Sequence, residues 1–163
     1  MPRQQRLFQT SIYCIDASAL INITRYPGYP RELFPSIWNK LEDMVKNDEL
    51  ISHEEVYKEI EKRQDKICDW CKQNKNMFKD IDECQIKEFE NVKKKYDSFY
   101  WNKEINKGGP WADPWIIALS ICEDAIIVTD ERNTRNHMPY IAKHFNLKCL
   151  NLIEFFVNIR IRY

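Results

Sequence analysis

Glycine is scarce in this sequence, with 3 among 163 residues. A phosphate-binding loop or a dinucleotide-binding fingerprint needs several glycines at fixed spacing, so both motifs are excluded. No apolar run approaches the roughly 20 residues that span a bilayer, so we expect no membrane segment. The 25 basic and 25 acidic residues cancel. A globally basic nucleic-acid binder is therefore excluded, and any nucleic-acid site has to be a local patch.

The remaining composition is that of a globular protein. Hydrophobic residues make up 44% of the chain and charged residues 31%, which is typical of one folded domain at this length. We therefore predict a single domain over residues 1–163. Residues 1–10 are polar and hold no apolar stretch long enough for a signal peptide, so we expect a cytoplasmic protein.

The cysteines give no disulfide pattern. A chain of this length buries enough surface to fold without cross-links, so we expect a reduced protein. Cys68 and Cys71 form a single Cys-x-x-Cys pair, with Cys84 as the nearest third thiol. Zinc needs four ligands, and a redox pair begins a helix after a strand, so we expect both to be free thiols. The others lie in apolar runs, where we expect buried thiols: Cys14, Cys122 and Cys149.

Apolar runs that do not alternate with polar residues predict buried parallel strands. These runs are residues 11–15, 49–52, 125–129 and 148–150. Helical periodicity fills the intervals, at residues 33–45, 53–70, 81–100, 114–122, 139–145 and 152–159. The alternation predicts an α/β fold, a three-layer α/β/α sandwich with a short parallel sheet. We expect a core over about residues 11–156 and a charged helical insertion or lid over about 61–107.

Acidic residues follow or open several of these predicted elements. Asp16 ends the first strand, Asp130 and Glu131 follow the strand at 125–129, and Asp113 opens a helix. Glu59 lies at the margin of a buried helical stripe. Because ligands of open α/β sheets bind beyond the carboxyl ends of the strands, we expect these carboxylates to converge.

Each carboxylate also has an ordinary structural interpretation. Asp16 and Asp113 can cap helices, the latter ahead of Pro114, and Glu59 can pair with Arg63 one turn later. Together, however, converging carboxylates repel one another unless a cation lies between them. Mg²⁺ and other hard cations bind carboxylates and water.

Four segments, in order, resemble the motifs of PIN-domain ribonucleases near the virulence-associated protein C type of toxin. They are Tyr13–Ile21, His53–Ile60, Gly109–Leu119 and Ile127–Glu131. The resemblance implies Mg²⁺ or Mn²⁺ held by these catalytic carboxylates: Asp16, Glu59, Asp113 and Glu131. The family's fourth motif is usually Thr-x-Asp, which places Glu131 in register with its carboxylate and leaves Asp130 as the alternative ligand. Ser18 and Thr129 are hydroxyls beside these acids, suited to orienting them or to contacting phosphate.

The resemblance implies a metal-dependent endoribonuclease that hydrolyses RNA phosphodiester bonds. One candidate role is the toxin of a toxin–antitoxin pair, with an antitoxin protein as partner; exposed aromatic residues would also suit a homodimer. The alternative is a non-catalytic PIN-like module that binds RNA or protein. A small-molecule phosphohydrolase ranks last, because it would want a second aspartate two residues after the first, where Ser18 stands.

A basic run interleaved with aromatic residues is the candidate RNA contact. Lys93, Lys94 and Lys95 precede four aromatic residues, Tyr96, Phe99, Tyr100 and Trp101. Lysines can meet phosphates while bases stack on aromatic rings. The same spacing also describes a solvated helix face over a core stripe. Two further candidates for phosphate contact follow the last acidic motif: Arg132 and Arg135.

Overall fold

A computed structural model describes residues 11–25 and 27–161; the prediction about a signal peptide in residues 1–10 lies outside these ranges. The described chain forms a five-stranded sheet in the order β3-β2-β1-β4-β5, and each neighbouring pair is parallel. The strands are β1 Tyr13–Ile15, β2 Leu50–His53, β3 Phe78–Lys79, β4 Ile126–Val128 and β5 Cys149–Leu150.

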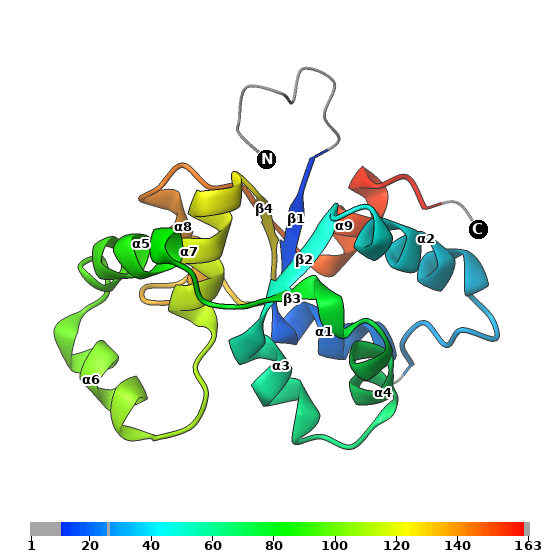
Figure 1. The fold of residues 1–163 in the computed structure, drawn as a ribbon, viewed down its shortest axis with the longest axis horizontal. Helices are drawn as coiled ribbons and strands as arrows, with labels where there is room; N and C mark the ends of the chain where they lie inside the picture. The colour runs from blue at the N-terminus through cyan, green and yellow to red at the C-terminus, as the bar shows by residue number, and fades with distance from the viewer. Residues whose placement is uncertain (1–10, 26, 162–163) are drawn as a thin grey trace.

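Helices cover both faces of this sheet, which lies between them in Figure 1. On one face α7 contacts β1, β2 and β4, and α5 and α8 pack on α7. On the other side α2 contacts β2, and α1 contacts α3, α4 and α9. The helices are α1 Ala17–Thr24, α2 Pro35–Lys46, α3 Glu54–Glu61, α4 Lys66–Gln73, α5 Glu83–Lys93, α6 Ser98–Asn106, α7 Asp113–Glu123, α8 Met138–Lys143 and α9 Leu152–Asn158. The predicted three-layer α/β/α sandwich with a parallel sheet is confirmed.

The central strands are buried on both faces. Cys14 and Ile15 of β1, and Ile127 and Val128 of β4, have no exposed surface, as expected of parallel strands between helices. Among the described residues, no helix is long and apolar enough to cross a membrane.

Two predicted helices are each divided by an aspartate. The helix predicted at 53–70 ends at Glu61, Gln64 adopts a left-handed backbone, and α4 begins after Asp65. The Asp65 side chain accepts the amide of Cys68 at 3.1 Å, which caps α4. Asp97 caps α6 in the same way, by accepting the amide of Tyr100 at 3.0 Å. Capping of this kind stabilises a new helix start.

The charged segment 61–107 contributes to the sheet as well as to the helical layers. Its strand β3 pairs with β2, opposite Ser52 and His53. This strand was not predicted, because it has only two residues and they form no apolar run in the sequence. Its helix α5 packs on α7.

A disulfide joins α5 to α7. Cys84, near the start of α5, is bonded to Cys122, near the end of α7, with their Cα atoms 6.1 Å apart. The expectations that Cys122 is a free buried thiol and that the chain is fully reduced are therefore wrong. Cys84 lies in a charged stretch of the sequence and Cys122 in an apolar one, and neither context indicates a disulfide. The two cysteines meet because α5 and α7 pack side by side.

Candidate metal centre

Three carboxylates from three separate segments meet beyond the carboxyl ends of the central strands. One ligand oxygen from each of Asp16, Asp113 and Glu131 lies within 4.8 Å of the others. Asp16 follows β1, Asp113 opens α7, and Glu131 follows β4. Since β1 and β4 pair in parallel, the chain leaves both strands at the same edge, which is where such sheets bind ligands.

Asp16 occupies the N-cap position of α1 but makes no capping hydrogen bond. Instead, its Oδ2 accepts hydrogen bonds from the hydroxyls of Ser18 at 2.9 Å and Thr129 at 3.0 Å. The Ser18 hydroxyl in turn accepts the amide of Asp130. The two hydroxyls predicted to orient the acids therefore hold Asp16, which is only 3% exposed.

Asp113 is the first residue of α7 and stands one position after its N-cap residue, Ala112, so Asp113 does not occupy the capping position that the sequence predicted for it. Pro114 follows at a position where its missing N–H leaves no partner unsatisfied. The orphaned amide of Ala112 is instead satisfied by Oε1 of Glu59, at 3.1 Å. Glu59 therefore reaches α7 from α3 and holds the start of the helix that carries Asp113.

Glu59 stands beside the three-carboxylate group and is not one of its members. Its oxygens fall outside the set in which all ligand atoms lie within 4.8 Å of one another. The charges of Asp16 and Glu131 nevertheless act on it. Of the four carboxylates that the sequence predicted, the structure brings three together and places the fourth next to them.

The structure distinguishes Glu131 from Asp130. Glu131 belongs to the group, and its Oε2 accepts the amide of Met138 at 3.1 Å. Asp130 points to other partners: its Oδ1 accepts the amide of Leu152 at 2.8 Å and its Oδ2 accepts the side-chain amide of Asn22. Asp130 therefore holds the start of α9 against α1 and is not brought into the group.

The pKa values of these acids are raised. Burial raises the pKa of Asp16 to about 6, and the charge of Glu131 adds to this effect, while hydrogen bonds from Ser18, the Ala17 backbone and Thr129 oppose it. Burial raises the pKa of Glu59 to about 7. The pKa of Asp113 lies well above its usual range because of burial and the charges of Glu131 and Asp16. A nearby cation would relieve this unfavourable crowding of negative charge.

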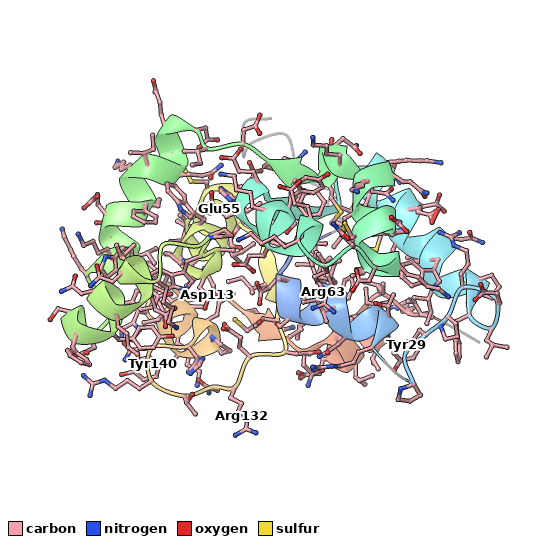
Figure 2. All side chains as sticks on the ribbon, turned by 90° about the horizontal axis from the view of Figure 1, so that it is seen from below. Tyr29, Glu55, Arg63, Asp113, Arg132 and Tyr140 are labelled. Carbon is pink, nitrogen blue, oxygen red and sulfur yellow. A yellow bond between two sulfur atoms is a disulfide. The ribbon has the colours of Figure 1, made fainter. Side chains whose placement is uncertain are left out.

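No lysine or arginine of the described residues neutralises the group. Within residues 11–25 and 27–161, no lysine or arginine forms an ion pair with Asp16, Asp113 or Glu131. His137 Nδ1 lies 3.8 Å from Glu131 Oε1. In Figure 2, which looks onto the lower side of Figure 1, Asp113 lies within the molecule whereas Arg132 projects outward away from it.

The predicted RNA contacts lie on the surface. Lys93, Lys94 and Lys95 are exposed at the end of α5, and Lys93 Nζ lies 5.6 Å from the ring centre of Trp101. The aromatic residues that follow these lysines differ in exposure: Tyr96 and Trp101 are buried, whereas Phe99 is 79% exposed. Arg132 and Arg135 are exposed after Glu131, and Arg135 lies 3.8 Å from Asp97.

The Cys-x-x-Cys pair does not take part in this centre. Cys68 and Cys71 are buried in α4 and form no disulfide. Burial raises the pKa of Cys71 to about 12. Cys84, the nearest third thiol, is occupied by its disulfide with Cys122.

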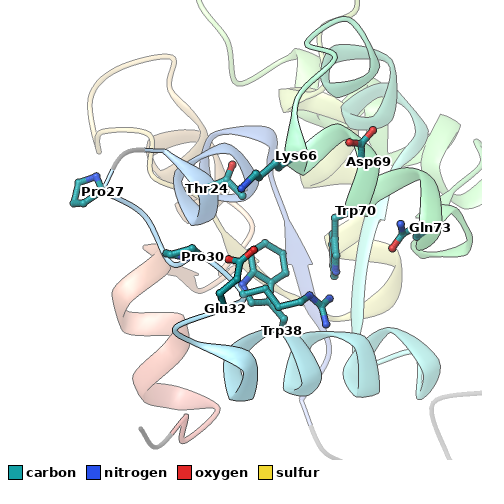
Figure 3. A pocket seen from close by; sticks show the side chains of 10 residues that line it. Thr24, Pro27, Pro30, Glu32, Trp38, Lys66, Asp69, Trp70 and Gln73 are labelled. Atoms are coloured by element: carbon teal, nitrogen blue, oxygen red, sulfur yellow. The ribbon is translucent and has the colours of Figure 1, made fainter.

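A cavity of about 280 Å³ lies elsewhere, between α1, α2 and α4 (Figure 3). Trp38 and Trp70 form part of its wall, with ring centres 5.6 Å apart. None of the predicted site residues lines it.

Sequence reasoning missed one polar group near the carboxylates. The hydroxyl of Tyr96 is buried and finds no hydrogen-bond partner in the part of the chain that the structure describes. The charges of Asp113, Glu131 and Asp16 act on it. The helical period had indicated that Tyr96 faces inward, but nothing in the pattern indicated which residues it would face.

The comparisons with known proteins concern the family. No curated protein matches this chain significantly. Residues 13–163 match the family described as "Domain of unknown function (DUF4411)". Because that match spans nearly the whole chain, this protein belongs to the DUF4411 family.

Proposed function

We propose that this protein is a metal-dependent ribonuclease that hydrolyses RNA phosphodiester bonds with Mg²⁺ or Mn²⁺. The observation that carries the proposal is that Asp16, Asp113 and Glu131 each bring a carboxylate oxygen within 4.8 Å of the others. Asp16 stands at the N-cap position of α1 yet makes no capping hydrogen bond, and Asp113 opens α7 one position after the N-cap residue. Oxygen-only ligands from carboxylates are what Mg²⁺ and Mn²⁺ favour.

The residues present fit such a cation in number and in chemistry. Asp16, Asp113 and Glu131 would hold it, and no lysine or arginine of the described residues forms an ion pair with them. A bound divalent cation supplies charge stabilisation at the phosphate and lowers the pKa of water. The hydroxyls of Ser18 and Thr129 fix the orientation of Asp16, as partners of metal ligands commonly do.

Glu59 has a separate role in this proposal. Its Oε1 accepts the Ala112 amide, so the carboxyl is fixed at the edge of the group. In the metal-free protein the pKa of Glu59 is raised to about 7, mainly by burial. A carboxyl that titrates near neutral pH beside the reacting phosphate would suit general acid–base catalysis. That this activity serves as the toxin of a toxin–antitoxin pair stays a prediction.

The test uses the full chain and an end-labelled single-stranded RNA of mixed sequence. We expect cleavage with Mn²⁺ or Mg²⁺ and none with excess chelator. Asp113→Asn should reduce cleavage at least about 100-fold, because one of three ligands loses its charge. Asp65→Asn is the matched control, because Asp65 is a true cap and asparagine caps equally well.

Two results would contradict the proposal: cleavage by the wild-type chain in the presence of chelator, or full activity of Asp113→Asn. A wild-type protein that binds Mn²⁺ and RNA but never cleaves would favour the non-catalytic binding module.

A further inference from the structure

Tyr96 lies in the short connection between α5 and α6, with its ring fixed by neighbouring aromatic residues. Tyr96 is only 6% exposed. The ring centre lies 5.3 Å from that of Trp101 and 5.3 Å from that of Trp111. Trp111 is two residues before Asp113 in the chain. The aromatic packing therefore holds Tyr96 beside the start of α7.

The hydroxyl of Tyr96 has no hydrogen-bond partner among the described residues. A buried hydroxyl without a partner is unfavourable, and such groups in native proteins commonly have a functional explanation. After burial, the charges of Asp113 and Glu131 raise the pKa of this hydroxyl most, and Tyr100 and Asp16 contribute less. The unpaired donor therefore lies in the field of all three carboxylates of the group, with Asp113 acting most strongly.

Asp113 is the carboxylate whose own hydrogen bonding differs from that of its neighbours. The other three acids each accept a hydroxyl or a backbone amide: Asp16 from Ser18 and Thr129, Glu131 from Met138, and Glu59 from Ala112. The side-chain partner of Asp113 is the carboxyl of Glu131. Two carboxylates that share a cation are both ionised and cannot donate to each other, so Asp113 loses this partner and can accept a hydrogen bond from another donor.

We propose that Tyr96 is a positioning residue whose hydroxyl donates a hydrogen bond to the carboxylate of Asp113 when that carboxylate holds a divalent cation. This inference rests on the proposed metal centre. It assigns to the buried aromatic cluster a task beyond packing, namely to orient one ligand. Hydrogen-bond partners of metal ligands typically contribute about 10–100-fold in metal affinity.

The experiment compares Tyr96→Phe with the wild type and with Tyr100→Phe, in the full chain. Tyr100 is the matched control, because its half-buried ring belongs to the same cluster, 6.1 Å from that of Tyr96. The Kd for Mn²⁺ alone is measured by calorimetry, and the melting temperature is measured without metal. We expect Tyr96→Phe to weaken Mn²⁺ binding by about tenfold or more. Its melting temperature should be unchanged or higher, because an unpaired buried hydroxyl is removed.

The two measurements separate a positioning role from a structural one. A positioning role weakens Mn²⁺ binding without lowering the melting temperature, whereas a structural role lowers the melting temperature. Loss of Mn²⁺ affinity together with a lower melting temperature would overturn the proposal, and so would equal losses of affinity in both tyrosine variants. Unchanged Mn²⁺ affinity in Tyr96→Phe, with a wild type that binds Mn²⁺, would refute the role of Tyr96 and leave the metal centre intact. A wild type that binds no Mn²⁺ would refute both.

Discussion

The hydroxyl of Thr129 donates a 3.0 Å hydrogen bond to Oδ2 of Asp16, although 113 positions separate the two residues. Thr129 follows β4 and Asp16 follows β1, and these strands are neighbours in the sheet. The bond holds the carboxylate in one orientation without contributing any positive charge. Asp16 is therefore kept rigid, buried and electrostatically unfavourable, which is how a metal ligand is prepared.

Replacing Asp16 by asparagine tests this arrangement directly. Asp16→Asn should keep or raise the melting temperature of the metal-free protein, because a buried charge beside other charges is removed. A pKa raised from 3.8 to about 6 corresponds to at most about 3 kcal/mol at neutral pH. The same variant should lose Mn²⁺ binding by calorimetry and lose RNA cleavage. Full cleavage by Asp16→Asn would refute the mechanism, and Asp65→Asn serves as the control.

Stability should depend on pH in a defined direction. Because folding raises the pKa of Asp16 to about 6 and of Glu59 to about 7, the folded protein binds protons more tightly than the unfolded chain. The resulting stabilisation of the folded protein is fully present below the pKa values of these carboxyls in the unfolded chain, about 4. It is lost as the pH rises through their folded pKa values, about 6 to about 7. The increase in melting temperature caused by Mn²⁺ should therefore grow between about pH 5 and about pH 8.

A second titrating group makes the choice of comparison important. Burial lowers the pKa of His53 below its value of 6.5 in the unfolded chain. The stability that His53 contributes to the folded protein is therefore present above pH 6.5 and is lost as the pH falls. Its sign is opposite to that of the carboxyls. Subtracting the profile of Glu59→Gln from that of the wild type cancels His53. The difference should show the wild type losing stability relative to the variant as pH rises through about 7; a flat difference would contradict the raised pKa of Glu59.

Asp130 and Glu131 should respond to mutation in opposite ways. Asp130→Ala removes the acceptor for the Leu152 amide and should lower the free energy of unfolding by about 1–2 kcal/mol. It should leave the Kd for Mn²⁺ unchanged. Glu131→Gln should weaken Mn²⁺ binding at least about tenfold without lowering metal-free stability. The reverse pattern would make Asp130 the ligand.

The disulfide between Cys84 and Cys122 should contribute measurably to stability. It closes a loop across 38 positions, for which loop-closure entropy gives at most about 4 kcal/mol. Dithiothreitol should lower the melting temperature of the wild type and leave that of Cys84→Ser/Cys122→Ser unchanged. Alkylation of the unfolded, unreduced chain should modify the four free cysteines and spare this pair. Modification of all six would contradict the disulfide.

The sequence was most informative where a residue's role follows from its local context. The strands that precede Asp16 and Glu131 were predictable because buried parallel strands are continuous apolar runs. The position of Asp113 was predictable because proline marks the start of a helix. The capping interpretation of these aspartates was equally well founded locally. The aspartates that do cap helices include Asp65 and Asp97, which the sequence reading had placed inside or beside helices.

What could not be predicted depends on contacts between distant segments. The disulfide between Cys84 and Cys122 forms because α5 packs on α7. The sequence around each cysteine does not indicate that these two helices are neighbours. Glu59 was expected as a ligand, but its hydrogen bond to the Ala112 amide places it beside the group. The unpaired hydroxyl of Tyr96 is recognisable only once the surrounding atoms are known. Helical periodicity identifies a buried face and does not specify its neighbours.

The 113 positions between Asp16 and Thr129 also have a consequence for biosynthesis. Translation proceeds at roughly 5–20 residues per second, so about 6–23 s pass between the addition of Asp16 and that of Thr129. Throughout this interval the nascent chain has the first carboxylate and the hydroxyl of Ser18, but lacks the hydroxyl of Thr129 and the later acid, Glu131. The complete set of proposed ligands therefore does not exist on the ribosome until β4 and the residues just after it have been made. Any reaction that depends on the cation begins only after most of the chain has been synthesised.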